Sequence, residues 1–544
     1  MNGYDVMARV LQAEGVEFLA AFPHQTLIDA AAKIGIRPII CRQERAGVNI
    51  ADGFSRVSNG RNFGVFTMQQ GPGSENAFAG VAQAYADSVP MLHLPGGERL
   101  PRLGINPTFD AVTTYTPITK WAARIHRIQD IPTLMRTAIT RMRSGNPGPV
   151  LLEMPVDVMT QDFPEEDFSY YPVQHHLSMA SPKDIEGVVG ALLDAKEPVI
   201  VAGQGILYAQ ATPELIEFAE LTNTPVMTTL AGKSAFPEDH ALSLGTGGHS
   251  CTPAVSHFLG QMDFGLGVGT SFTRNTFTTP MPDGVVLAQV TNCPEDIGKD
   301  YEVAYAAVGD AKLVLRQMIE EVKNHLGDEG APDNRDVVGR LATLQQKFQE
   351  DWNSRFNSEE VPISPYRVFQ EIKAACGTSN TIITHDSGYP RDQLVPTWNT
   401  NTPRGYLGWG KSTQLGYGMG LAIGAKLAAP QKTVVNVMGD AAFGMGGMDL
   451  ETAVREEIPI ITVVLNNGVM TKYDSHMPTA TTRYASNALG GNYAQVAEGL
   501  GAHAERVETP NDLSSAFQRS LDANREGKPA LVEVVTKVEE VVPG

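Results

Sequence analysis

The chain has 544 residues, of which 42% are hydrophobic and 19% charged, a composition typical of folded globular proteins. This length exceeds what one hydrophobic core supports, so we expect two to four domains. The net charge of −19 argues against nucleic acid or an anionic membrane as a partner.

Short apolar strands alternate with amphipathic helices along the chain, which indicates an α/β fold with parallel sheets. The first unit, residues 1–165, opens with a helix pattern and ends in a strand at 149–155. A polar, acidic stretch at 161–179 predicts a linker. The middle unit then covers residues 181–323 and the third unit residues 360–544.

The third unit holds the most informative pattern. Residues 433–438 predict a buried strand that runs into Gly439-Asp440, residues 448–457 can form a helix, and residues 458–465 predict a second strand that ends at Asn466-Asn467. Asp440 and Asn467 would then lie at the carboxyl ends of adjacent parallel strands, where α/β sheets bind ligands. Their oxygen atoms suit Mg²⁺, whose remaining ligands are often phosphates and water. Two ordinary loops are the alternative interpretation.

The separation of Asp440 and Asn467 (467 − 440 = 27) and its strand–helix–strand context resemble the binding motif for thiamine diphosphate (ThDP). Ala441 stands where that motif has glycine. The resemblance implies that Asp440 and Asn467 bind Mg²⁺ through side chains and Val469 through its carbonyl, and that the metal holds the diphosphate. It also implies coenzyme contacts at a further group of residues: Gly388, Gly439, Ala441 and Ala442.

A ThDP enzyme also needs a carboxylate beside the aminopyrimidine ring, because the coenzyme reacts as a carbanion after losing a proton. Glu44 follows the apolar residues 39–41, precedes Ala51-Asp52-Gly53-Phe54-Ser55-Arg56, and resembles the family's cofactor-activating glutamate. The alternative role for Glu44 is that of a first-turn acid stabilised by the helix dipole.

The glycine-rich segment 413–420 resembles the part of the family that holds the coenzyme in a V shape. Leu415 falls at the position of the apolar wedge between the two rings. The carbonyl of Thr413 falls where a hydrogen bond from the 4′-amino group is accepted. Without the resemblance, this segment would be a glycine-rich helix start that packs on a sheet.

The order of the three units resembles the pyruvate oxidase and acetolactate synthase branch of ThDP enzymes over nearly the whole chain. That branch implies two ThDP-binding parallel-sheet domains, one for the pyrimidine and one for the diphosphate, which flank a Rossmann-like middle domain. It also implies a homodimer or homotetramer, because the glutamate and the metal site meet across a subunit interface.

The residues expected on the substrate side differ from those of well-known relatives. His24 and Gln25 replace a Pro-Gly-Gly type of turn and could hydrogen-bond a substrate, or Thr26 could simply cap a helix. Gln70 in the glycine turn at 69–73 is either a substrate contact or a turn residue. Tyr473 stands six residues after Asn467, where some protonating decarboxylases carry glutamate. This difference favours carboligation or C–C cleavage, with Tyr473, His476 or His24 as candidates for moving protons.

The middle unit departs from the flavin-binding pattern of acetolactate synthases. Residues 269–275 lack the Asp-Asp pair that precedes an arginine, and Arg274 is displaced by one position. Thr291 and Asn292 stand where an acid often follows the next strand. These departures argue against FAD.

We therefore expect a ThDP- and Mg²⁺-dependent lyase or transferase, an acetolactate synthase-like carboligase that acts on 2-oxo acids. The alternatives are a 2-hydroxyacyl-CoA lyase or oxalyl-CoA decarboxylase that acts on an acyl-CoA, and an inactive regulatory homologue. Four scattered cysteines, and no visible secretory signal or membrane span, predict a cytoplasmic protein without a membrane partner.

Overall fold

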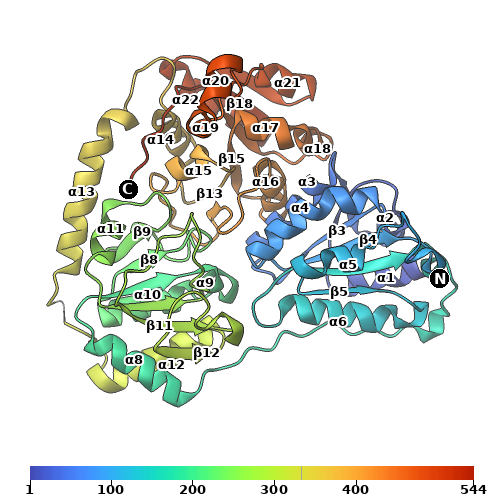
Figure 1. Ribbon diagram of the computed structural model, residues 1–544, viewed down its shortest axis with the longest axis horizontal. Coiled ribbons are helices and arrows are strands. Elements are labelled where there is room, and N and C mark those ends of the chain that lie inside the picture. Colours follow the sequence, from blue (N-terminus) through green and yellow to red (C-terminus); the bar gives the residue numbers. More distant parts are fainter. Residues whose placement is uncertain (333) are drawn as a thin grey trace.

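The structure is a computed structural model that describes residues 1–332 and 334–544. Within these residues the chain forms three parallel sheets of six strands each, one in each expected unit (Figure 1). The expected α/β fold with parallel sheets is therefore confirmed. The boundaries 1–165, 181–323 and 360–544 remain predictions.

The first sheet has the strand order β2-β1-β3-β4-β6-β5. Its strands are β1 (Phe18–Ala21), β2 (Arg37–Ile40), β3 (Gly64–Met68), β4 (Met91–Gly97), β5 (Trp121–Arg124) and β6 (Val150–Pro155). Its helices are α1 (Gly3–Ala13), α2 (Thr26–Lys33), α3 (Glu44–Val57), α4 (Pro72–Ala86), α5 (Ala111–Tyr115), α6 (Ile131–Arg143) and α7 (Val156–Met159).

The middle sheet has the order β12-β11-β10-β7-β8-β9. Its strands are β7 (Pro198–Ala202), β8 (Val226–Thr228), β9 (Ser243–Thr246), β10 (Phe264–Val268), β11 (Val286–Thr291) and β12 (Tyr305–Val308). Its helices are α8 (Pro182–Asp194), α9 (Gln204–Ala209), α10 (Thr212–Thr222), α11 (Pro253–Leu259) and α12 (Ala311–Leu326), and α13 (Val337–Phe356) leads to the third unit.

The third sheet has the order β14-β13-β15-β16-β18-β17. Its strands are β13 (Thr381–His385), β14 (Tyr406–Leu407), β15 (Thr433–Gly439), β16 (Ile461–Asn466), β17 (His503–Val507) and β18 (Ala530–Val535). Its helices are α14 (Pro365–Cys376), α15 (Tyr389–Leu394), α16 (Gly418–Ala428), α17 (Asp440–Gly446), α18 (Leu450–Arg455), α19 (Tyr473–His476), α20 (Pro478–Tyr484), α21 (Tyr493–Gly499) and α22 (Leu513–Arg525).

Two details of the third unit differ from the sequence prediction. The second strand begins at Ile461 rather than at residue 458, because Pro459 has no N–H to donate to a ladder. The helix expected at 448–457 is shorter, because a 3₁₀ turn at Gly447–Asp449 precedes α18. Helix α17 begins at Asp440, directly after Gly439.

The first and third units share a hydrophobic core. One buried cluster joins Phe66 and Met68 of β3 to Leu421 of α16 and Met438 of β15. Within this core α3 lies directly on α16, where a Cβ at Gly420 would come within 2.7 Å of the Ala46 carbonyl oxygen. The two helices therefore touch backbone to backbone, which fixes the first unit on the third.

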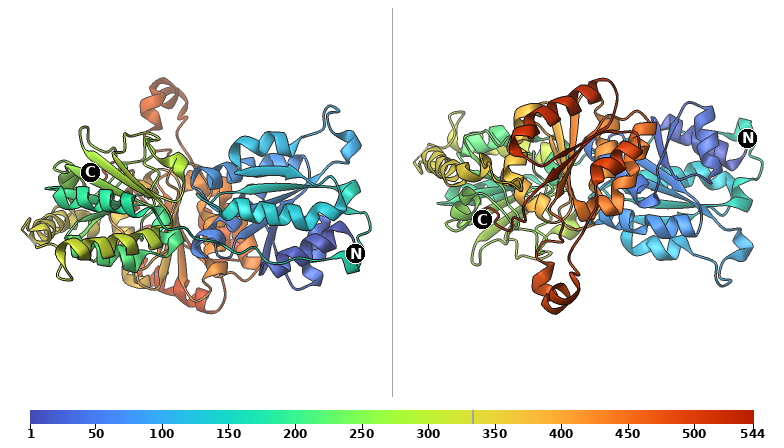
Figure 2. Two further views of the ribbon diagram at one scale, coloured as in Figure 1. Left: turned by 90° about the horizontal axis from the view of Figure 1, so that it is seen from below. Right: turned by 90° about the horizontal axis from the view of Figure 1, so that it is seen from above.

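The segment of α19 and α20 stands away from the body of the molecule, in orange in Figure 2. Neither helix contains a buried residue. Tyr473 is 46% exposed and Tyr484 is 77% exposed. The chain after Asn467 thus leaves the third sheet and returns to it at α21.

Candidate active site

A cavity of about 150 Å³ lies at the carboxyl ends of β13, β15 and β16. Its position follows from the β–α–β order of the third sheet, because β15 pairs in parallel with β16 and Gly439 lies opposite Leu465. The structure brings together in its lining most of the residues predicted for the coenzyme and metal: Gly388, Leu415, Gly439, Asp440, Ala441, Ala442, Asn467 and Val469. Tyr473, predicted as a catalytic residue, also lines it.

Asp440 and Asn467 are fixed by backbone hydrogen bonds at this edge of the sheet. Asp440 is 4% exposed, and its two carboxylate oxygens accept the N–H groups of Ala441 at 2.7 Å and Gly468 at 2.9 Å. The Asn467 side-chain oxygen accepts the Val469 N–H at 3.1 Å. Burial raises the pKa of the Asp440 carboxyl, an effect that a neighbouring cation would oppose.

These residues fit the donor set of a magnesium ion that also binds phosphate. They offer a carboxylate, an amide oxygen and a backbone carbonyl, all hard oxygen ligands, and leave positions for phosphate or water. Val469 is held by an antiparallel bridge to Ala488, so the loop that presents it has a defined course.

The segment of residues 408–417, here called the wedge segment, contributes to the wall of the same cavity. It has no regular structure between β14 and α16, and Leu415 contributes to the cavity wall. Asp386, which is fully buried, accepts the N–H groups of Gly416 and Gly418, each at 2.9 Å. Thr413 lies two residues before Leu415 and outside the lining.

Glu44 occupies a different place. It is the first residue of α3, is 5% exposed, and accepts a hydrogen bond from Asn76 Nδ2 at 3.2 Å. Both roles considered for Glu44 are compatible with this position, because a first-turn acid can also face a ligand. Within one chain Glu44 is not part of the lining of the cavity that contains Asp440.

The predicted substrate residues of the first unit gather at the end of β4. A Cβ on Gly96 would lie 2.7 Å from Gln25 Nε2 and 3.3 Å from Gln70 Oε1, so both amides converge on this glycine. His24 has a φ of 89°, an uncommon backbone conformation for a residue other than glycine. Thr26 does not cap α2: it is the first residue of the helix, and the cap position belongs to Gln25. The capping explanation for this turn is therefore wrong.

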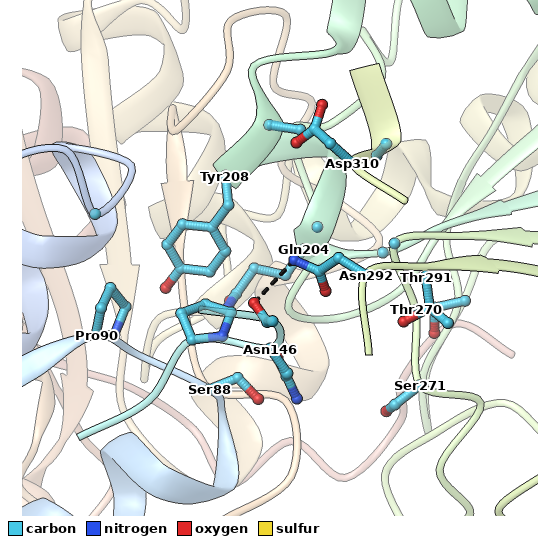
Figure 3. Close-up of a pocket in the computed structure, with 18 of the residues that line it drawn as sticks. Ser88, Pro90, Asn146, Gln204, Tyr208, Thr270, Ser271, Thr291, Asn292 and Asp310 are labelled. Carbon is cyan, nitrogen blue, oxygen red and sulfur yellow. Dashed lines mark hydrogen bonds between the residues drawn. The ribbon is translucent and has the colours of Figure 1, made fainter. Parts of the chain in front are cut away.

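A larger cavity of about 400 Å³ separates the first unit from the middle unit (Figure 3). Gly203, Gly269 and Thr291 line it from the carboxyl ends of β7, β10 and β11. Asn292 Nδ2 donates to the Gly145 carbonyl at 2.9 Å, the dashed line in Figure 3. Figure 3 shows the polar side chains that surround this space, among them Ser88, Asn146, Gln204, Tyr208, Ser271 and Asp310.

Sequence reasoning missed several residues of these sites. Tyr389, Lys537 and Glu539 line the smaller cavity although they belong to no motif. Asp386 lies in the turn after β13, and the residues that its carboxylate holds lie 30 and 32 positions away. Local patterns indicate strand ends but not the long-range contacts of their side chains.

Models of thiamine pyrophosphate enzyme domains match all three units. The N-terminal TPP binding domain matches residues 1–115, the central domain 185–318 and the C-terminal TPP binding domain 386–534.

Among known proteins, a probable acetolactate synthase large subunit of Methanococcus aeolicus is 30% identical to the chain, over 96% of the chain and 90% of that protein. The acetolactate synthase isozyme 3 large subunit of Escherichia coli K12 is 27% identical over 98% of the chain and 94% of its own length. A glyoxylate carboligase of Escherichia coli O157:H7 is 28% identical over 98% and 93%.

In the described residues, no helix combines the length and the apolar character that crossing a membrane requires. The chain belongs to the thiamine pyrophosphate enzymes, in the branch of acetolactate synthase and pyruvate oxidase.

Proposed function

We propose that the protein is a ThDP- and Mg²⁺-dependent carboligase that acts on 2-oxo acids, in the manner of an acetolactate synthase. The observation that carries this proposal is the cavity in which Asp440, Asn467 and Val469 meet at the ends of β15 and β16. The names of the relatives, acetolactate synthase and glyoxylate carboligase, support the reaction class. All four cysteines are free, which supports a cytoplasmic location.

In this proposal the third unit holds the coenzyme by its diphosphate. Asp440 and Asn467 bind Mg²⁺ through their side chains and Val469 through its carbonyl. Gly388, Gly439, Ala441 and Ala442 leave room for the phosphates beside the metal. Leu415 wedges between the rings, and the Thr413 carbonyl accepts a hydrogen bond from the amino group.

When bound, ThDP supplies a nucleophilic carbon and an electron sink for reactions at a carbonyl group. The role of Glu44 is to hydrogen-bond the aminopyrimidine ring and so favour the tautomer that takes up the proton. Because Glu44 lies outside its own chain's coenzyme cavity, we propose that Glu44 of a second copy completes it. The active form is then a homodimer, or a homotetramer made of two dimers.

The substrate side is formed by His24, Gln25, Gln70 and Tyr473. The convergence of the Gln25 and Gln70 amides at Gly96 supports a role in hydrogen-bonding the carboxylate or carbonyl of a 2-oxo acid. Tyr473 borders the coenzyme cavity and is half exposed, as a group that exchanges protons with solvent would be.

Flavin is not part of this proposal. Arg274, the arginine displaced in the sequence pattern, lies over the ring of Tyr301 at 4.1 Å and is outside the lining of the larger cavity. Asn292, at the position of a common acid, is engaged by the Gly145 carbonyl. Neither position has the side chain of the flavin-binding pattern of the branch, which supports leaving flavin out of the proposal.

Calorimetric titration of the protein with ThDP and Mg²⁺ tests the proposal. The wild-type chain should bind both. Changing a residue that only supports a metal ligand costs about 10–100-fold in metal affinity. Asp440→Ala removes a ligand itself and should therefore weaken Mg²⁺ binding by at least about 100-fold. Glu44→Gln should keep coenzyme binding and lose turnover. Asp522→Ala, at an exposed surface acid, is the matched control and should change neither.

A panel of pyruvate, other 2-oxo acids and a 2-hydroxyacyl-CoA, scored by mass spectrometry, then separates the reaction classes. Carboligation products from 2-oxo acids support the proposal. Formyl-CoA from the 2-hydroxyacyl-CoA would instead identify the acyl-CoA lyase type. Unchanged turnover in Glu44→Gln, or no coenzyme uptake by the wild type, would overturn the proposed role.

A further inference from the structure

The wedge segment between β14 and α16 is held at both ends by buried carboxylates. At its far end, Asp386 of the third unit accepts the N–H groups of Gly416 and Gly418. At its near end, Asp87 of the first unit accepts the N–H of Gly410 at 3.1 Å and that of Lys411 at 3.0 Å. Between these two anchors lie residues 412–415, which include Thr413 and Leu415.

Asp87 is itself fixed by a buried arginine. It is 4% exposed, and its Oδ2 accepts hydrogen bonds from Arg56 Nη2 and Gln83 Nε2, each at 3.1 Å. Arg56 is 1% exposed, donates from Nε to Asp52 at 2.5 Å, and donates from Nη1 to the Gly408 carbonyl at 2.9 Å. The guanidinium thus binds the segment directly and also through Asp87.

This network has the features of a rigid support. Its charged groups are almost completely buried. The carboxylate oxygens of Asp87 accept hydrogen bonds from one guanidinium, one side-chain amide and two backbone N–H groups. Buried polar groups that are satisfied in this way fix a unique arrangement, because moving any of them leaves an unpaired charge.

Helix α3 connects this support to the glutamate proposed for catalysis. Glu44 is its first residue and Arg56 lies in its last turn. At a rise of about 1.5 Å per residue, the helix spans roughly 20 Å between them. Its backbone rests on α16, where a Cβ at Gly424 would lie 2.0 Å from the Ile50 carbonyl oxygen. One stiff element therefore carries Glu44 and anchors the segment that carries Leu415.

We propose that Asp87, fixed by Arg56, is a positioning residue that presents Thr413 and Leu415 to the coenzyme. The inference rests on the proposed function, because it assigns the coenzyme to that segment. Asp87 does not line the coenzyme cavity and acts through the backbone of residues 410 and 411. A structural contact alone would affect stability, whereas a positioning residue also sets coenzyme affinity.

Asp87→Asn is the informative change, because it keeps the shape of the side chain but removes its charge and one acceptor oxygen. Glu238→Gln is the matched control. Glu238 is also a buried carboxylate, 8% exposed, that accepts a backbone N–H of the third unit, that of Thr400 at 2.9 Å, but its other side-chain hydrogen bonds go to Lys233 and Thr246 of the middle unit and not to the wedge segment.

Hydrogen exchange of the full chain, followed by mass spectrometry, gives a readout that does not depend on activity. In Asp87→Asn, peptides that cover 409–415 should exchange faster than in the wild type, while peptides over β15 and α22 should not change. Titration with ThDP and Mg²⁺ should show a Kd raised by about tenfold or more, as expected when charge-assisted hydrogen bonds to the segment are lost. Glu238→Gln should lower the melting temperature and leave both readouts unchanged.

Should Asp87→Asn fail to fold, Arg56→Lys replaces it, because a lysine cannot bind Asp52, Asp87 and the Gly408 carbonyl together. Unchanged exchange at 409–415 and unchanged ThDP affinity in a folded variant would overturn the inference. Absence of ThDP binding by the wild type would instead overturn the proposed function. Hydrogen exchange of the coenzyme-free chain does not depend on ThDP, so it would still show whether Asp87 holds residues 409–415.

Discussion

Replacing Asp449 with asparagine should make the protein more stable at neutral pH. Asp449 ends the 3₁₀ turn before α18, is 2% exposed, and accepts the Arg42 N–H at 2.8 Å and the Thr452 hydroxyl at 3.0 Å. Burial raises the pKa of its carboxyl from 3.8 to about 6, although these two hydrogen bonds oppose the rise. An asparagine oxygen can accept the same two hydrogen bonds without carrying a charge.

The size of the effect follows from the two pKa values. A difference of about 2 units corresponds to about 3 kcal/mol between the protonated and the ionised group. Because the folded pKa is the higher one, the stabilising contribution is complete below the unfolded pKa of 3.8 and is lost as pH rises through about 6. Between about pH 4.5 and pH 7.5, Asp449 should therefore remove about 2 kcal/mol of stability.

Denaturant unfolding of the wild type and Asp449→Asn across this pH range measures the effect. The stability of the variant relative to the wild type should rise by about 2 kcal/mol from about pH 4.5 to pH 7.5. Asp522→Asn, at an exposed acid, should give a constant difference from the wild type. If the difference between Asp449→Asn and the wild type is also constant with pH, burial of Asp449 does not have the proposed energetic consequence.

Two further changes test a contact between the first and third units and a buried ion pair within the middle unit. Gly424→Ala should lower the melting temperature, because the added Cβ would lie 2.0 Å from the Ile50 carbonyl oxygen and overpacking costs about 1–3 kcal/mol. Gly444→Ala is the control and should not lower it, because a Cβ there would have nothing within 4 Å. Equal melting temperatures of the two variants would contradict this prediction. Lys233→Met should cost about 3–5 kcal/mol in denaturant unfolding, because it leaves Glu238 buried without its partner. Adding Glu238→Gln should recover much of this loss, and a double variant less stable than Lys233→Met would refute the explanation.

The sequence predicted the sheet elements of the third unit well, because apolar β-branched runs have few alternative structures. The strand expected at 433–438 is β15, Thr433–Gly439, and the strand expected at 458–465 is β16, Ile461–Asn466. The residues at which helices and strands begin and end were less predictable. Asp440, Ala441 and Ala442 form the first turn of α17, because alanine favours helix once Gly439 is extended.

The contacts of the candidate site also fall into two groups, those that a local sequence pattern predicts and those that it does not. Asp440 and Asn467 follow consecutive strands of one β–α–β unit, so their proximity could be inferred from local pattern and topology. Asp52 and Arg56 are four residues apart on one helix, and their pairing could also be inferred. The contact of Arg56 with Asp87, and of Asp87 with residues 410 and 411, depends on how the first unit packs on the third, which no local pattern contains.

The packing of α3 on α16 also bears on the proposed assembly. For Glu44 to reach the coenzyme cavity of its own chain, α3 would have to leave α16. That movement would separate the backbone contacts at Gly420 and Gly424 and break the hydrogen bonds that Arg56 and Asp87 make to residues 408–411. Leaving a buried charged group without hydrogen-bond partners costs more than the about 1–3 kcal/mol of a neutral group. Supply of Glu44 by a second copy requires none of these losses, so the rigidity within one chain itself favours a site shared between two.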